Sequence, residues 1–277
     1  MRTFTTPTPI AATVQVAGAR VQVIATDRTD TVVQVEPIDK ASKSDLKVAA
    51  KTKVEFAGGR LSVKTTASGD KNGSVVITIG LPAGSSLVTY LAHSTVQADG
   101  SYGDCELHLA SGKVQLDRVD ALQVNMSAGD ITVGHIAGRA TIDGSSGQIR
   151  IGHAAGEVEL SSSSAQVDID RTDGHVTATT ASGAIRIGLM TQGQAKLVNG
   201  NGNIEVGISE GTAASVDVAS DRGAVHNFVT MGTEPGPSDR RVSVHARTRH
   251  GDILVQRAGS AASTASAVSA VRASAAS

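Results

Sequence analysis

The 277-residue chain has little of several residue types, and each shortage excludes something. Its one cysteine, Cys105, cannot form an intramolecular disulfide, so the fold does not rely on covalent cross-links. Tryptophan is absent, and two tyrosines and three phenylalanines leave few rings for stacking bases or sugars. Twenty-five basic against 26 acidic side chains give a formal charge of -1, which supplies no attraction for nucleic acid or a membrane surface. We therefore expect neither of these partners.

Long apolar segments are also missing from the sequence. No apolar run approaches the roughly 18 residues that cross a bilayer as a helix, because Gly, Ser, Asp and Lys interrupt every candidate. The first 20 residues place Thr and Pro where a secretory signal needs an apolar stretch of about 7–15 residues. We therefore expect a soluble, cytoplasmic protein.

What the sequence does contain is an internal repeat of about 18 residues, beginning near Gly112. Each unit places a β-branched residue just after a turn, and the intervals between these residues are 17, 18, 18, 18, 19, 21 and 28. The residues are Val114, Ile131, Ile149, Val167, Ile185, Ile204, Val225 and Ile253. A second series of short strands alternates with the first, so each unit holds two strands and two turns.

Apolar and polar residues alternate within each strand, as in Ile149-Arg150-Ile151, which is typical of a strand with one buried face. No helical pattern occupies the repeat. Equal spacing predicts coils that stack and cover one another's apolar sides. We therefore predict an all-β chain, a parallel β-solenoid of the β-roll or β-helix type with about 18 residues per rung; the alternative is a β-sandwich. Ile131, Ile149, Val167 and Ile185 should then form one column.

The predicted organisation has three parts. Residues 1–100 contain longer strands without the fixed interval and are expected to form a β-rich N-terminal cap with one short helix, from Ala41 to about Lys53. Residues 101–258 are the solenoid repeats, interrupted by a Pro/Gly-rich insertion over 230–241 that explains the last interval. Residues 259–277 are rich in Ala and Ser and are expected to be disordered.

The expected helix carries a row of basic side chains. These are Lys40, Lys43, Lys47 and Lys51, whose spacing places them on one face. Such a row could bind an acidic partner, but the balanced charge of the chain favours an ordinary solvated helix face.

Stacking in register would also align the polar residues at the centres of the first-series strands, about 4.8 Å apart. Four consecutive members alternate in charge, namely Arg150, Asp168, Arg186 and Glu205. Opposite charges on neighbouring strands attract, so we interpret this charged ladder as a device that fixes register. An ion-binding or catalytic Arg/Asp cluster is the functional alternative.

Sequence signals for cofactors and metals are absent or weak. No phosphate-binding or dinucleotide-binding loop occurs, so we expect no cofactor and no small-molecule ligand. His135 and His153 are 18 residues apart and should lie on adjacent rungs, but no Cys or carboxylate in the sequence completes a metal site around them. We therefore expect a structural pair and no metal. Cys105 is in phase with Leu107 and Leu109, which predicts a buried and unreactive thiol.

Several phrases of the sequence resemble a known family. ITIGLPAGSS at 77–86, followed by repeated S-G-x-I-x-I units, is similar to the bacterial β-strand-repeat proteins labelled putative adhesins, a domain of unknown function. TFTTPTPI at 3–10 and RTRHGDILVQR at 247–257 resemble the compact actinobacterial members without export signals. The resemblance implies a repeat fold and brings no catalytic residues with it. The chain departs from the pattern at Ser164-Ala165, and at Ala92-His93-Ser94, where turn glycines are expected.

Two functional hypotheses follow from these observations. We favour a non-enzymatic scaffold or protein-interaction module that contacts an unknown protein or further copies of itself. The second hypothesis is a carbohydrate-active β-helix enzyme that uses the charged ladder as its site. The shortage of aromatic rings for sugars and the lack of a second convergent carboxylate pair argue against the enzyme.

Overall fold

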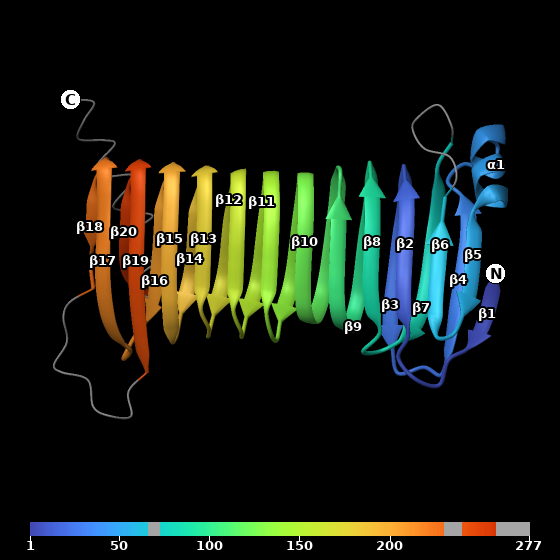
Figure 1. Ribbon diagram of the computed structural model, residues 1–277, viewed down its shortest axis with the longest axis horizontal. Coiled ribbons are helices and arrows are strands. Elements are labelled where there is room, and N and C mark those ends of the chain that lie inside the picture. Colours follow the sequence, from blue (N-terminus) through green and yellow to red (C-terminus); the bar gives the residue numbers. More distant parts are fainter. Residues whose placement is uncertain (66–72, 230–239, 259–277) are drawn as a thin grey trace.

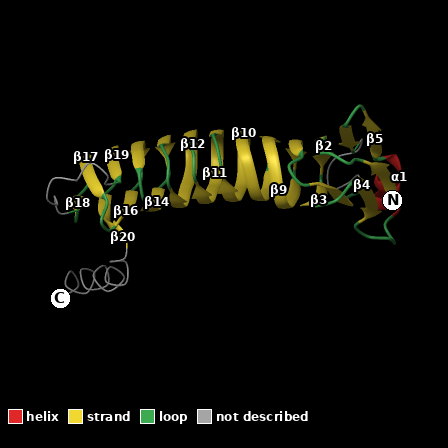
Figure 2. Cartoon of the chain, turned by 90° about the horizontal axis from the view of Figure 1, so that it is seen from below, coloured by secondary structure: helices red, strands yellow, loops and turns green. Residues whose placement is uncertain are grey.

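The computed structural model describes residues 1–65, 73–229 and 240–258. In this part of the chain, twenty strands stack along one long axis, and a single helix lies at one end (Figure 1). Turned by 90°, the same stack is narrow, with the N-terminal elements at one end and β17 and β18 at the other (Figure 2). The chain is therefore an elongated solenoid, as the repeat predicts.

The strands have the following bounds. The N-terminal elements are β1 (Arg2–Thr5), β2 (Ala11–Ala17), β3 (Ala19–Thr26), β4 (Asp30–Pro37), α1 (Lys43–Lys51), β5 (Lys53–Ala57), β6 (Arg60–Lys64) and β7 (Val75–Pro82). The central strands are β8 (Ser86–Ala92), β9 (Ser94–Leu109), β10 (Gly112–Ile136), β11 (Ala140–Ala154), β12 (Val158–Thr172), β13 (Val176–Ser182) and β14 (Ile185–Met190). The C-terminal strands are β15 (Gly193–Asn201), β16 (Ile204–Ser209), β17 (Ala213–Arg222), β18 (Val225–Asn227), β19 (Arg241–His250) and β20 (Ile253–Ala258).

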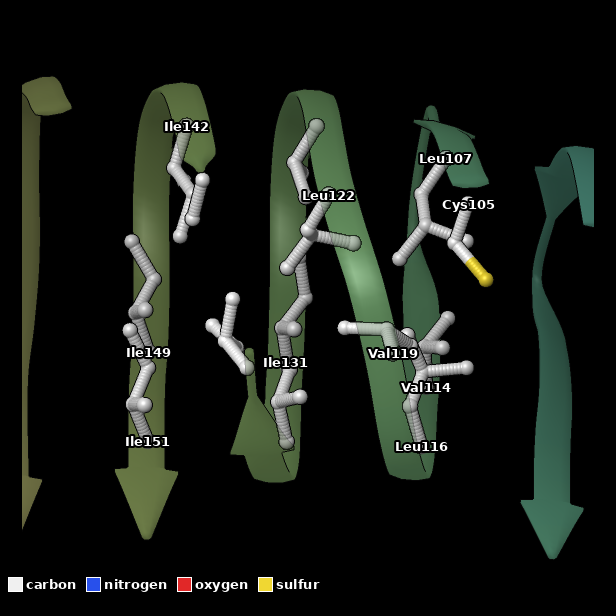
Figure 3. Close-up of a cluster of buried hydrophobic side chains, with 14 of the residues drawn as sticks. Cys105, Leu107, Val114, Leu116, Val119, Leu122, Ile131, Ile142, Ile149 and Ile151 are labelled. Atoms are coloured by element: carbon white, nitrogen blue, oxygen red, sulfur yellow. The ribbon is translucent and has the colours of Figure 1, made fainter. Parts of the chain in front are cut away.

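The centre of the stack has the predicted parallel register. Ile131 is the Cα partner of Ile149, Ile149 of Val167, and Val167 of Ile185. All four side chains are at most 1% exposed. In Figure 3 the labelled residues Ile131 and Ile149 lie side by side on adjacent rungs, within a core made of aliphatic side chains. The predicted column and the predicted β-solenoid are confirmed.

Glycine is needed at one corner of the rungs because neighbouring backbones approach closely there. Gly147 has φ +132, and a Cβ at this position would lie 1.8 Å from the carbonyl oxygen of Gly129. At the two positions that depart from the glycine pattern, the chain adapts. Ala165, the Cα partner of Gly147, is buried at 1% exposure, and His93 takes φ 50 in place of a turn glycine.

The N-terminal end is closed by elements that do not belong to the repeat. Its last parallel rung is β6 and β7, and β5 pairs with β6 in the antiparallel direction while β4 pairs likewise with β7. β1 continues this sheet by pairing with β4. Parallel pairing nevertheless begins before residue 101, because β2 lies between β6 and β8, and β3 between β7 and β9. The predicted division into domains at residue 100 stays a prediction.

The predicted helix is α1, which lies within the range expected for it. Ser42 caps its N-terminus, with Oγ accepting a hydrogen bond from the amide of Asp45 at 3.3 Å. The Asp45 carboxylate accepts hydrogen bonds from the amides of Asp39 and Ser74, at 3.0 and 3.1 Å. The helix is thereby fixed to the start of β7, and the lysines of its outer face stay exposed.

The C-terminal end corrects one expectation from the repeat. The spacing series places Val225 next to Ile204 and Ile253 last, but Ile253 is the Cα partner of both Ile204 and Val225. β19 likewise lies between β15 and β17. Figure 1 shows this as a break in the colour order, with β19 between β15 and β17. β19 and β20 thus insert into the stack, because both candidate rungs satisfy the same apolar pattern.

Two of the predicted segments fall largely or wholly outside the described residues. These are the insertion, of which residues 230–239 are not described, and the tail at 259–277. Within the described part, no helix has the length and apolar character needed to cross a bilayer.

Candidate interaction surface

The charged ladder lies on the outer side of β11, β12, β14 and β16. Arg150 and Asp168 are Cα partners, as are Asp168 and Arg186, and Arg186 and Glu205. Nη1 of Arg186 lies 2.8 Å from Oδ1 of Asp168, and Nε of Arg150 lies 3.7 Å from its other oxygen. Asp168 is therefore shared by two guanidinium groups, and the ladder predicted from the sequence exists in the structure.

Positive and negative side chains alternate along the charged ladder, so their charges compensate one another. The hydrogen bond from Arg186 to Asp168 raises the pKa of Arg186, and the nearby charge of Glu205 acts in the same direction. The Asp168 side chain is only 14% exposed, whereas both arginines are about half exposed. Glu205 ends the ladder, since its next partner is Leu254. These groups pair with one another and do not converge on a cleft.

A histidine cluster lies at the C-terminal ends of β10 and β11. His135 and His153 are Cα partners, with their Nδ1 atoms 3.1 Å apart and ring centroids 4.8 Å apart. Nε2 of His153 lies 2.8 Å from Oδ2 of Asp173. Asp173 also accepts hydrogen bonds from Arg171 and from the hydroxyl of Thr191. The predicted proximity of the two imidazoles is confirmed, and Asp173 is a carboxylate that the sequence analysis missed.

The environment of Asp173 keeps it ionised. Burial by itself would raise the pKa of Asp173, but hydrogen bonds from Thr191, Arg171 and His153 outweigh it and lower the pKa to about 2. The carboxylate therefore holds one imidazole through Nε2. Among the described side chains, no three or more His, Cys, Asp or Glu residues come together as a metal-binding group.

A groove follows one corner of the solenoid, where one strand of a rung ends and the next begins. It has two contiguous parts, of about 560 and 440 Å³, and Asn125 and Ser127 line both. Every corner residue along it is Ala or Ser, so no bulky side chain fills the hollow. These residues are Ala92, Ala110, Ser127, Ser145 and Ser163. We call this feature the corner groove.

Two aromatic rings line the part of the corner groove that has the larger volume. Tyr90 is 43% exposed and stacks on His108, with ring centroids 4.7 Å apart and an interplanar angle of 3°. Nε2 of His108 lies 2.7 Å from Oε1 of Glu106. The sequence analysis missed this pair, although the 18-residue interval between Tyr90 and His108 could have revealed it. Because each ring covers a face of the other, the stack offers less ring surface to a sugar than two separate rings would.

Cys105 lies in the core, as its sequence phase predicts. The residue is 2% exposed, and its Cα partners are Leu87 and Leu122. Burial raises the pKa of its thiol to about 12, so the thiolate is scarce at neutral pH. Figure 3 shows the sulfur among aliphatic side chains, which excludes this residue from a surface site.

Comparisons with known proteins agree with the repeat architecture. The model of the family described as Toastrack DUF4097 matches residues 12–260. A search of curated proteins finds no match.

Three solved structures match most of the length of this chain. A putative adhesin from Bacteroides fragilis is 11% identical, with 92% of this chain and 95% of that chain covered and a TM-score of 0.36. A putative adhesin and a putative lipid binding protein from Parabacteroides distasonis are 14% and 10% identical, with the same coverage and TM-scores of 0.46. Because these identities and TM-scores are low, the fold is assigned from the strand register of this chain alone.

Proposed function

The chain belongs to the Toastrack DUF4097 family, and from this premise we propose that it is a non-enzymatic protein-interaction module whose corner groove receives an extended segment of a partner protein. One observation carries the proposal: the groove continues across successive rungs from β2 to β12, and small side chains line its corner throughout. A surface of this length suits a chain-like ligand.

The shape of the corner groove argues against a small molecule. Sites for small ligands enclose most of the ligand surface, whereas this hollow runs along an outer corner and is open to solvent along its length. An extended peptide needs no enclosure, because its backbone and alternate side chains make contacts at a regular interval along the groove. Asn125 and the serines of the corner supply polar groups at the rung spacing.

The charged ladder supports the non-enzymatic part of the proposal. A glycosidase site needs two carboxylates that face each other across the bond that is cleaved, with space for the sugar between them. In the charged ladder, Asp168 is held between two arginines, and the next ladder carboxylate, Glu205, lies two rungs away beyond Arg186. The ladder thus resembles a register device more than an acid–base pair.

The test is a quantitative affinity capture with three variants. Ser127→Arg/Ser145→Arg fills the corner groove with two long side chains and should reduce the captured partner about tenfold or more. Thr177→Arg/Gln194→Arg places the same two charges on exposed positions elsewhere and should leave capture unchanged. Arg150→Ser/Asp168→Ser breaks the charged ladder and should also retain the partner.

Two results would contradict the proposal. Capture that survives filling of the corner groove means that the partner does not lie there. A hydrolytic activity on oligosaccharides that disappears in Arg150→Ser/Asp168→Ser means that the ladder is a catalytic site.

A further inference from the structure

The outermost rung at the C-terminal end is built like an inner rung but has a neighbour on one side only. We call β17, β18 and Phe228 the open end. β17 pairs with β19, and β18 pairs with β20, both in the parallel direction of the stack. Among the residues that the structure describes, no strand pairs with the other edge of either. A row of backbone donors and acceptors therefore faces away from the molecule.

The inward-facing side chains of the outermost rung are more exposed than their partners in the next rung, because no further layer covers them. Val225 is 43% exposed, whereas its Cα partner Ile253, one rung further in, is 0% exposed. Val216 is half-buried, whereas its partner Val244 is 1% exposed. On the outer side of the same rung, Phe228 is 62% exposed and stacks on His226, with ring centroids 6.2 Å apart. The open end presents core residues without the layer that would cover them.

The edge strand β17 also lacks the features that protect sheet edges. Lysine and proline commonly block pairing at an edge, and the ten residues of β17, AASVDVASDR, contain neither. Its central charge, Asp217, is already paired with Arg247 and His245 on β19. The pairing of this charge within the chain lowers the cost of bringing a second, identical strand alongside.

Other parts of the molecule indicate what would cover the open end. The N-terminal end cannot continue the stack, because antiparallel β4 and β5 and helix α1 close it. The C-terminal residues 259–277 contain no Leu, Ile, Met or aromatic residue, so they have little apolar surface with which to cover Phe228. The open end of a second copy brings the same unpaired edge and the same apolar side chains.

We infer that two copies of this chain associate through their open ends, with β17 antiparallel to β17 of the second copy about a two-fold axis. Such a contact is self-complementary and closes at two copies, because the described residues of each chain form one open end. This inference goes beyond the proposed function, because it uses a surface separate from the corner groove.

The size of the contact sets its strength. Ten residues of β17 extend about 33 Å, and two facing sheets are about 10 Å apart, so each copy buries roughly 300–500 Å². A standard stable interface buries about 800 Å² per partner. We therefore expect a reversible dimer with a dissociation constant in the micromolar range.

Sedimentation velocity of the full chain, over a concentration series spanning about two decades, tests the inference. The native chain should pass from monomer to dimer and form nothing larger. Val225→Lys/Phe228→Lys places like charges against their own copies and should weaken association about tenfold or more. Val198→Lys alters another exposed valine, 37% exposed on β15, and should leave association unchanged.

Hydrogen exchange of the native chain provides a second measurement that does not depend on folding of the variants. Amides of β17 should exchange more slowly as the concentration rises, while those of β13 should not respond. A monomer at every concentration, polymers, unaltered association of Val225→Lys/Phe228→Lys, or β17 protection independent of concentration each overturns the inference. Dimerisation that appears only after removal of residues 259–277 also overturns it. Failure of partner capture leaves the dimer prediction standing, so the two proposals fail separately.

Discussion

The two ends of this solenoid are alike in having an inserted strand and differ in whether their outermost rung is covered. At both ends a segment inserts into the stack out of sequence order: β2 lies between β6 and β8, and β19 lies between β15 and β17 (Figure 1). The N-terminal end is then covered, and Val63 and Ile77 in its last rung are 0% exposed. In the last rung of the C-terminal end, Val225 is 43% exposed.

The difference between the two ends indicates which elements close a solenoid. Insertion of a terminal segment anchors the chain but leaves the outermost rung with a free edge. Closure at the N-terminal end comes from strands of the opposite direction and from a helix, which cover the edge and present no further parallel strand. The open end lacks such elements among the described residues, so it can pair with another copy.

Matched truncations at the two ends should show the largest difference. Val63 is flanked by Val14 and Val54, so Val63→Ala leaves a cavity and should cost about 2 kcal/mol. Val225→Ala, at the open end, removes a side chain that is partly in water and should cost less than about 0.5 kcal/mol. Urea denaturation of both variants measures the difference, and equal losses would mean that the open end is covered.

A smaller effect comes from the histidine cluster, between the two ends. The pKa of Asp173 is about 2 when folded and 3.8 ordinarily, so its contribution to stability is complete above about pH 4. It is lost as the pH falls from about 4 to about 2. Asp173→Asn should cost on the order of 1–2 kcal/mol at pH 7, and little at pH 2, in urea denaturation. A loss that persists unchanged at pH 2 would rule out this ionisation as the cause.

The helix cap gives a third effect, confined to the covered end. Ser42→Ala removes the acceptor for the Asp45 amide and should cost about 1 kcal/mol, whereas Ser42→Thr keeps a hydroxyl and should retain most of the stability. Hydrogen exchange should locate the change in α1 and the adjoining start of β7. Equal losses in the two variants would show that the hydroxyl does not act as a cap.

The smallest effect is expected from an ion pair at the open end. The hydrogen bond from Arg247 lowers the pKa of Asp217, but the Asp217 side chain is 65% exposed, so solvent and salt screen the pair. Asp217→Asn should shift the unfolding midpoint slightly at low ionic strength and not at high ionic strength. A shift that grows with salt would contradict this explanation.

The sequence predicted the parts of the fold that depend on local period. One β-branched residue recurs every 18 residues or so, which is one full rung, and these residues therefore stack in a column. The column consists of Ile131, Ile149, Val167 and Ile185. The order of the last rungs could not be predicted, since Val225 and Ile253 follow similar turns and either could pack on Ile204. The N-terminal rungs were hidden because β4, α1, β5 and β6 separate β3 from β7 in the sequence, which removes the fixed interval.

The candidate surface was predictable to a similar extent. The charged ladder follows from one residue per rung, and His135 and His153 from their interval. Asp173 was missed because it lies in a turn, outside the alternation that identifies strands, and reaches His153 across a rung. The corner groove was missed because it arises from small side chains. The Ala or Ser at the corner of each rung leaves space that a larger side chain would fill.

The inserted order of the C-terminal rungs is the central claim, and a cysteine cross-link tests it directly. His245 is the Cα partner of both Lys196 and Asp217, so neighbouring positions are about 4.8 Å apart and the outer two about 10 Å apart. A disulfide needs Cα atoms about 4.4–6.8 Å apart. Under mild oxidation at low protein concentration, Lys196→Cys/His245→Cys should cross-link within the chain and Lys196→Cys/Asp217→Cys should not. The reverse result would contradict the inserted order.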